Sequence, residues 1–130
     1  MWPTIDGMST DLRRTFGQAG EQLATEHLQR LGHTIVTRNH RTRFGELDIV
    51  SRIGPALVFT EVKTRRSGKD ARPFDALGPA KRAQVRRMAF AYLAEVTDRP
   101  TTAEIRFDAI GVVIDTRGRL TALDHLEGAF

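Results

Sequence analysis

The sequence has no cysteine among its 130 residues. This absence excludes disulfide bonds, thiolate nucleophiles and cysteine-based zinc sites, and it fits a reducing compartment. Long hydrophobic runs are also missing: no segment approaches the roughly 18 continuous apolar residues of a membrane span, and residues 1–20 contain no secretory hydrophobic region. We therefore expect a cytoplasmic protein with no part embedded in a membrane.

Several catalytic and metal-binding patterns are absent as well. The chain contains neither a glycine-rich phosphate-binding loop of the P-loop type nor a GxSxG motif, which argues against nucleoside triphosphate hydrolysis, serine-hydrolase chemistry and a nucleotide cofactor. The four histidines show no mutual spacing typical of metal ligands; they are His27, His33, His40 and His125. A zinc site is therefore not expected.

Length and composition indicate a single globular domain. Hydrophobic residues make up 40% of the chain and charged residues 28%, which is close to ordinary globular usage. A chain of this length can bury one core. We expect residues 1–9 to be a disordered N-terminus and residues 10–130 to form one domain.

Basic residues gather in three clusters along a chain whose formal net charge is +4. The clusters contain Arg38, His40, Arg41 and Arg43, then Lys63, Arg65, Arg66, Lys69 and Arg72, then Lys81, Arg82, Arg86 and Arg87. Each cluster alone could be a solvated face. Because all three flank one carboxylate-rich segment, they favour a nucleic-acid partner.

Hydrophobic patterning predicts an α/β fold. Apolar residues at helical spacing predict helices over residues 11–31 and 79–96, while β-branched or alternating runs predict strands over 33–38, 46–52, 56–64, 104–114 and 120–124. Gly54 and Pro55 predict a turn that makes a hairpin of the second and third strands. The third strand, second helix and fourth strand should form a right-handed crossover, so the central sheet should be mixed and flanked by helices.

Three carboxylates fall where burial is costly. Glu21 lies on the apolar stripe of the first predicted helix, where it is either a site residue or a boundary residue that reaches solvent or caps an amide. Glu61 interrupts an apolar strand. If the hairpin is symmetric about Gly54 and Pro55, residues whose numbers sum to 109 face each other, which places Asp48 opposite Glu61 at about 5 Å.

Two carboxylates this close repel each other unless a proton or a cation neutralises them. Oxygen ligands suit Mg²⁺ or Mn²⁺, and such an ion can activate water and polarise a phosphodiester. Lys63 lies on the same strand face as Glu61 and could stabilise charge on the phosphate. The alternative is a salt bridge of Lys63 with Glu61 or Asp48 on a solvated sheet face.

Two motifs then resemble a known family. The segments Gly45-Glu46-Leu47-Asp48 and Phe59-Thr60-Glu61-Val62-Lys63-Thr64-Arg65 resemble the GE(I/L)D and (F/V)xEVKxR pair of the PD-(D/E)xK, or restriction-endonuclease-like, superfamily. More narrowly, residues 17–130 resemble the YraN family of small bacterial proteins. Further matching positions are Gly20-Glu21, Ala24, Arg38-Asn39, Arg43, Lys81, Arg106-Phe107-Asp108 and Gly128-Ala129-Phe130. Leu47 stands where the superfamily name has proline.

The resemblance implies a restriction-endonuclease-like αβββαβ core and assigns roles by position. Asp48 and Glu61 resemble metal-binding carboxylates, with the backbone carbonyl of Val62 as a further ligand, and Lys63 resembles the catalytic lysine. Glu21 resembles the first-helix acid of archaeal Holliday-junction resolvase relatives. The residues assigned to DNA binding are Arg43, Arg65, Arg66, Lys81 and Arg82. Lys81 resembles a second-helix polar residue that reaches the site edge, although a solvated lysine at a helix start is the alternative.

These observations leave three functions open. The first is a Mg²⁺- or Mn²⁺-dependent DNA endonuclease, with branched DNA and a two-fold dimer as candidate substrate and assembly. The second is a nucleic-acid-binding module that keeps the nuclease fold without cleaving, and the third is a structural or interaction domain. Arg106 and Asp108 share a face of the fourth predicted strand, and a buried ion pair or a hydrogen-bonded polar pair in the core is favoured for them over a catalytic role.

Overall fold

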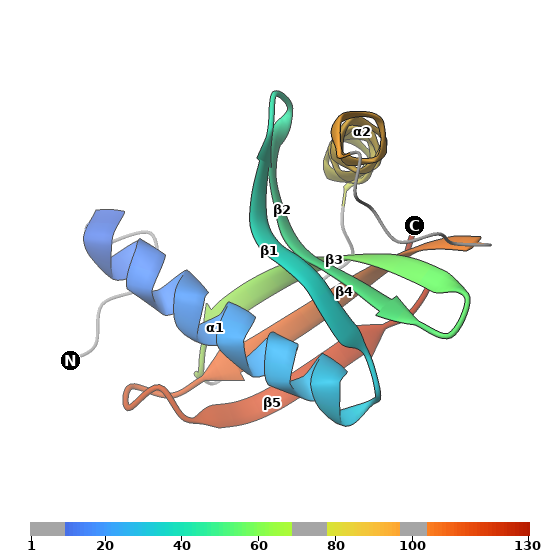
Figure 1. Ribbon diagram of the computed structural model, residues 1–130. Helices are drawn as coiled ribbons and strands as arrows, with labels where there is room; N and C mark the ends of the chain where they lie inside the picture. Colours follow the sequence, from blue (N-terminus) through green and yellow to red (C-terminus); the bar gives the residue numbers. More distant parts are fainter. Residues whose placement is uncertain (1–9, 69–77, 97–103) are drawn as a thin grey trace.

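The computed structural model describes residues 10–68, 78–96 and 104–130 (Figure 1). The predicted order of helix, three strands, helix and two strands is confirmed, and the N-terminal segment expected to be disordered lies outside the described residues. The elements are α1 (Thr10–Arg30), β1 (Thr34–Thr42), β2 (Gly45–Ile53), β3 (Ala56–Arg66), α2 (Pro79–Glu95), β4 (Glu104–Ile114) and β5 (Leu120–Leu126).

All five strands form one mixed sheet in the order β1-β2-β3-β4-β5. Neighbours pair antiparallel except β3 and β4, which pair parallel over eleven residue pairs from Ala56–Glu104 to Arg66–Ile114. Because parallel strands need a crossover connection, α2 lies between these two strands in the chain. The predicted mixed sheet with flanking helices is therefore confirmed.

The two helices bury their apolar stripes against separate core clusters. The α1 cluster joins Phe16, Ala24 and Leu28 of the helix to Ile49, Ile110, Val112 and Ile114 of the sheet. The α2 cluster joins Val85, Met88, Ala89 and Tyr92 to Leu47, Val50, Leu57 and Phe59. Full burial of one such large side chain is worth about 1.5–3 kcal/mol, so these stripes fix each helix on the sheet.

Gly20 lies in the middle of α1, where the sequence suggests a weak helix. The structure shows why glycine occupies this position: it is buried, and a Cβ added there would overlap the side chain of Thr64 on β3. The missing side chain lets α1 approach β3 closely. The helical propensity lost at this glycine is offset by close packing of α1 on the sheet.

We predict that Gly20→Ala destabilises the fold by about 1–3 kcal/mol, because the added methyl group forces α1 away from β3. Urea unfolding followed by circular dichroism measures the loss. Gly17→Ala is the matched control, since a Cβ at Gly17 meets no atom within 4 Å and should stabilise the helix slightly. Equal effects at the two positions would contradict close packing at Gly20.

The β1–β2 hairpin extends further than the sequence predicts. Pairing continues past Arg38 through His40–Leu47 to Thr42–Gly45, although this part of β1 is polar. Asn39 interrupts the strand with a φ of 53°, a left-handed conformation that asparagine tolerates better than most residues. Beyond this point the hairpin rises away from the rest of the sheet and its tip reaches the side of α2 (Figure 1).

Within the described part of the chain, neither helix is long and apolar enough to cross a membrane.

Candidate functional site

The predicted hairpin register is confirmed for β2 and β3. Five pairs from Ile53–Ala56 to Ile49–Thr60 all have residue numbers that sum to 109. The ladder then stops one position before Asp48 and Glu61, where β2 follows β1 away from the sheet (Figure 1). Asp48 and Glu61 therefore lie on either side of the point where these two strands separate.

The Asp48 side chain lies between β2 and β3, where the two strands separate. Its Oδ2 accepts a hydrogen bond of 2.8 Å from the backbone N–H of Val62, which has no partner from the β2 backbone at this level. Asp48 also shares a side-chain hydrogen bond with Glu61. Burial, followed by the negative charge of Glu61, raises the pKa of Asp48 to about 8. Asp48 therefore keeps its proton at neutral pH when no divalent cation is bound, and this proton removes one of the two like charges.

The backbone of Val62 adds an oxygen to this pair. In a strand, the N–H and C=O of one residue point toward the same neighbouring strand. The Val62 N–H points to Asp48, so its carbonyl points the same way, into the region where the β2 ladder has ended. The Asp48 and Glu61 carboxyl groups and the Val62 carbonyl form an oxygen donor set of the kind that Mg²⁺ and Mn²⁺ bind.

Glu61 takes its positive partner from α2. Only 9% of this residue is exposed, and its Oε1 lies 3.1 Å from the Nζ of Lys81. The alternative of a solvated lysine at the start of the helix is therefore wrong for Lys81. The alternative of a salt bridge between Lys63 and Glu61 or Asp48 is also wrong. Lys63 is exposed and forms no ion pair or hydrogen bond within the described ranges, although strand alternation keeps it on the face of Glu61.

Glu21 approaches the carboxyl pair from α1. It is half-buried and its side chain is hydrogen-bonded to Asn39. The pKa of Glu21 is raised, chiefly because the side chain is partly buried. The hydrogen bond from Asn39 and the charge of Arg38 lower this pKa, and the negative charges of Glu46 and Glu61 raise it. Glu21 in turn raises the pKa of Asp48. The predicted first-helix acid is thus electrostatically linked to the pair.

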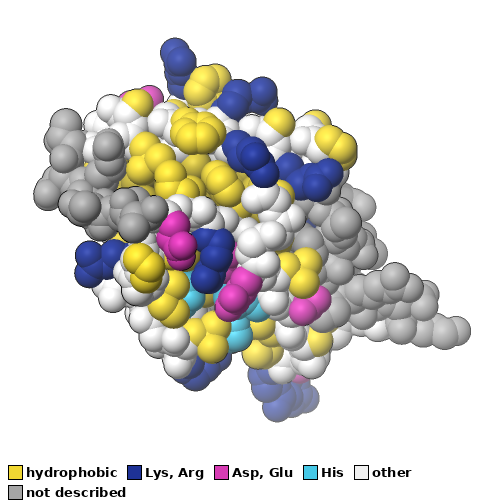
Figure 2. Space-filling view, turned by 90° about the vertical axis from the view of Figure 1, so that its right-hand side faces the viewer, with side chains coloured by type: hydrophobic (Ala, Val, Ile, Leu, Met, Phe, Trp, Pro, Cys, Tyr) yellow, Lys and Arg dark blue, Asp and Glu magenta, His cyan; other side chains and the backbone are white. Residues whose placement is uncertain are grey.

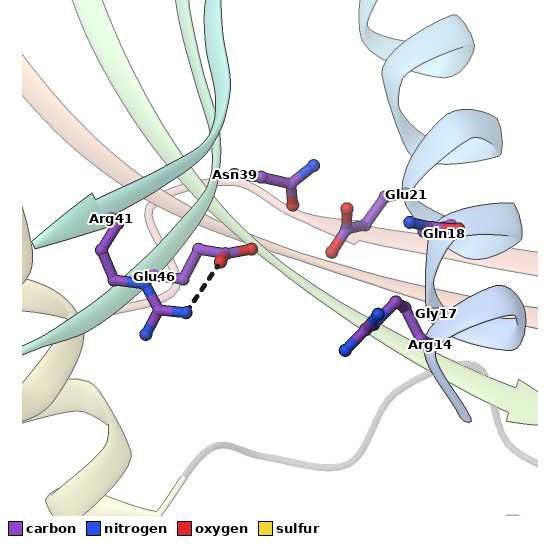
Figure 3. Close-up of a pocket in the computed structure, with 7 residues that line it drawn as sticks. All are labelled: Arg14, Gly17, Gln18, Glu21, Asn39, Arg41 and Glu46. Atoms are coloured by element: carbon purple, nitrogen blue, oxygen red, sulfur yellow. Dashed lines mark ion pairs between the residues drawn. The ribbon is translucent and has the colours of Figure 1, made fainter. Parts of the chain in front are cut away.

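A pocket of about 460 Å³ opens in front of Glu21 (Figure 3). Figure 3 shows Glu21 of α1 facing Asn39 and Glu46 of the β1–β2 hairpin across this space, with Arg41 held near Glu46 at 3.8 Å. The lining residues are Arg14, Gly17, Gln18, Glu21, Asn39, Arg41 and Glu46. Carboxylates and arginines share this pocket, so it can hold a cation and an anionic group together.

Sequence reasoning missed Glu46 and Asn39 as site residues. Glu46 is two residues before Asp48 on β2, and this same-face spacing within the GELD segment was the available signal. The β1–β2 register on either side of Asn39, Arg38–Ile49 and His40–Leu47, places it opposite Asp48. Nothing local in the sequence indicates this position of Asn39, because it depends on the extension of β1.

No group of three or more acidic or histidine side chains is close enough to hold a metal ion among the residues that the structure describes. Glu21 is therefore near the Asp48–Glu61 pair without completing a cage. This geometry still fits Mg²⁺, which commonly keeps several waters and takes one or two protein carboxylates together with substrate phosphate.

The residues assigned to DNA binding occupy different environments. Arg43 at the hairpin tip and Arg82 on α2 are exposed, and Lys81 is engaged by Glu61. Arg65 and Arg66 at the end of β3 are partly buried and interact with other groups. Arg43 and Arg82 are therefore the most accessible of the five to an anionic partner.

The favoured ion pair of Arg106 and Asp108 is confirmed. Asp108 is fully buried and accepts hydrogen bonds of 2.9 Å at each carboxylate oxygen from Arg106. His125 Nε2 also lies 2.7 Å from Asp108 Oδ2, and His27 lies 3.1 Å from His125. His27 and His125 are therefore in contact although they are far apart in the sequence. Thr60 pairs with Asp108, and side chains alternate between the two faces along β3, so Glu61 lies on the opposite face of the sheet from Asp108.

Comparisons with known proteins agree on one family. The model of "Uncharacterised protein family UPF0102" matches residues 20–112. A UPF0102 protein of Acidothermus cellulolyticus is 41% identical over 126 residues, which cover 91% of this chain and 95% of that protein. A UPF0102 protein of Streptomyces griseus subsp. griseus is 44% identical over 89% of this chain and 96% of that protein. The chain therefore belongs to the UPF0102 family, the YraN-like proteins.

Proposed function

We propose that this chain is a PD-(D/E)xK-type DNA endonuclease that hydrolyses phosphodiester bonds with Mg²⁺ or Mn²⁺. The observation that carries the proposal is the pair of partly buried Asp48 and buried Glu61 beside the Val62 N–H, at the point where β2 leaves β3. A carboxyl pair that needs a proton to remain together is costly to the fold, and a divalent cation would remove this cost.

Each residue of the proposed site has a role that its position supports. Asp48, Glu61 and the Val62 carbonyl would hold the metal ion, which when bound supplies a more acidic water and a polarised phosphate. Lys63 is exposed on the face of Glu61, so its ammonium can reach a phosphate oxygen. Glu21 is linked electrostatically to the pair from α1 and is suited to orient a water molecule.

DNA is the proposed substrate because basic groups surround an acidic centre. Arg43 and Arg82 are exposed and accessible, and Lys81 is at the edge of the site. Such groups neutralise backbone phosphates without reading sequence, which suits a nuclease selected by DNA shape. Branched DNA is the candidate shape.

A non-catalytic nucleic-acid-binding module is the second candidate. The contact of 3.1 Å between Lys81 and Glu61 favours it, because an ammonium group already neutralises part of the site. In that case the acids would maintain the fold, while the arginines would bind DNA. The two candidates differ in what happens when a divalent cation is added.

The test is cleavage of labelled linear, flapped and four-way-junction DNA with Mg²⁺ or Mn²⁺. We expect Glu61→Gln and Lys63→Ala each to lower the cleavage rate at least about a hundredfold, because each removes a group that acts on the reacting phosphate or its metal ion. Glu95→Gln, which removes an exposed acid at the end of α2, is the matched control. Circular dichroism establishes that each variant is folded.

Salt-sensitive DNA binding without cleavage by the wild-type protein would favour the binding module over the nuclease. Lys81→Ala separates the two candidates further. In a nuclease this variant frees Glu61 and should tighten Mg²⁺ binding, whereas in a binding module it should only weaken DNA binding.

A further inference from the structure

An aromatic side chain stands exposed at the tip of the β1–β2 hairpin. Phe44 is 36% exposed, and two guanidinium groups contact its ring: Arg43 at 4.8 Å and Arg87 of α2 at 5.8 Å from the ring centroid. Large aromatic residues usually bury their rings, so an exposed ring beside two cations requires an explanation.

The tip is held in place by several contacts. Gln84 of α2 donates a hydrogen bond of 2.9 Å to the Phe44 carbonyl. The Thr42 hydroxyl accepts a hydrogen bond from the Phe44 N–H and donates one to the Gly45 carbonyl. Gly45 has a φ of 134°, and a Cβ there would lie 2.9 Å from Gln84 and 3.0 Å from Met88. The hairpin therefore presents Phe44 in a fixed position against α2.

The surface around Phe44 is basic and partly apolar. Ala83, Arg86, Arg87 and Phe90 follow one another along the exposed side of α2, and Phe90 is 60% exposed. The first turn of α2 contains no acidic residue. Figure 2, which views the molecule from the side of α2, shows hydrophobic side chains in its upper part, at the height of α2, with lysine and arginine side chains around them. This combination suits an anionic partner that also has flat apolar faces.

We propose that Phe44, with Arg43 and Arg87, forms a stacking platform for an unpaired nucleotide of DNA. This inference rests on the proposed function and specifies its substrate class. An aromatic ring stacks on any base, and arginines can contact the base plane or the adjacent phosphates. A base inside a duplex has both faces covered by its neighbours, so the platform selects single-stranded, flapped or splayed DNA.

The position of the platform fits the proposed cleavage site. Phe44 lies in the hairpin turn, four residues before Asp48 of β2. A strand rises about 3.3 Å per residue, so the two residues are at most about 13 Å apart. Successive phosphates of one strand are about 3.4 Å apart along the axis of a B-form duplex and further apart in an extended single strand. An unpaired base on Phe44 would therefore leave the carboxyl pair within reach of a phosphodiester a few nucleotides away.

The test is DNA binding in the presence of EDTA, which keeps binding separate from cleavage. Fluorescence anisotropy compares a labelled oligo(dT) with a blunt duplex of the same length at one salt concentration. We expect Phe44→Ala to weaken oligo(dT) binding about tenfold and duplex binding less than about twofold. Phe44→Trp should retain oligo(dT) binding, and Phe44→Leu, which is apolar without a flat ring, should behave like alanine.

Leu31→Ala is the control for a general loss of exposed apolar surface, because Leu31 is 47% exposed at the end of α1. It should bind oligo(dT) as the wild type does.

The platform would be overturned if Phe44→Ala left oligo(dT) binding unchanged, or if it weakened duplex binding equally. The exposed ring would then indicate a protein partner. If the wild-type chain cleaves DNA in the presence of Mg²⁺ while the Phe44 variants bind normally, the platform fails and the nuclease stands. Phe44-dependent binding without cleavage supports the platform on a binding module.

Discussion

Asp108→Ala is expected to lower the free energy of unfolding by about 3–5 kcal/mol, because it removes one partner of a buried ion pair. The Asp108 carboxylate is fully buried and accepts hydrogen bonds at both oxygens from Arg106. It also accepts one of 3.1 Å from the Gly128 N–H and contacts His125 at 2.7 Å. One carboxylate therefore joins β4, β5 and the C-terminal segment.

The loss should exceed that of an ordinary cavity because Arg106 and His125 each lose a hydrogen-bond partner inside the fold. Burial alone would raise the pKa of Asp108, but the bonds from His125, Arg106 and the Gly128 amide hold it below its usual value. Without the carboxylate, Arg106 and His125 keep their desolvation cost and lose this compensation.

Urea denaturation at neutral pH measures the effect. Asp108→Asn, which retains shape and part of the hydrogen bonding, should fall between the alanine variant and the wild type. Asp124→Ala, which removes an exposed carboxylate from β5, should change stability by less than about 0.5 kcal/mol. If Asp108→Ala unfolds at the wild-type urea concentration, this cluster contributes nothing to the stability of the fold.

The elements of the fold could be predicted because their patterns are local. Apolar spacing identified both helices within one or two residues of their ends, and β4 was predicted with its observed bounds, residues 104–114. The β2–β3 register followed from the turn at Gly54 and Pro55, because a two-residue turn determines which residues face each other. A strand whose outer half is polar gave no such signal, so β1 was predicted to end four residues early.

The carboxyl pair could be predicted because both residues are in one hairpin. Once the register is known, arithmetic places Asp48 and Glu61 next to each other at the end of the ladder, although the pairing itself stops one position earlier. The partners from other elements could not be derived in the same way. Lys81 reaches Glu61 only because α2 crosses the sheet at a particular position, and the contact of His27 with His125 spans 98 residues. Such contacts depend on helix placement, which sequence periodicity does not specify.

A second large effect is expected from the proton on Asp48. Its pKa in the folded protein is raised from 3.8 to about 8, so between these two values the folded chain keeps a proton that the unfolded chain releases. Raising the pH through this window therefore favours unfolding. The free energy of unfolding should fall by up to about 1.4 kcal/mol per pH unit between pH 4 and 8, and then level off.

Urea denaturation across this pH range measures the slope. Asp48→Asn cannot ionise and should flatten it, with its largest gain in stability over the wild type near pH 8. Asp124→Asn, at an exposed carboxylate, should keep the wild-type slope. The same slope in all three proteins would show that Asp48 is ionised in the fold throughout, which would remove the electrostatic argument for the site.

Divalent cations should reverse this pH dependence if the pair binds metal. Mg²⁺ or Mn²⁺ requires the ionised carboxylate, so binding must displace the Asp48 proton and should tighten as the pH rises. We expect millimolar Mn²⁺ to raise the melting temperature more at pH 8 than at pH 5, and not to raise it in Asp48→Asn. Stabilisation comes from binding to the folded state alone, so its size gives the affinity. If Mn²⁺ does not change the melting temperature at pH 8, the Lys81 ammonium is the cation that neutralises the site. This result would favour the binding module.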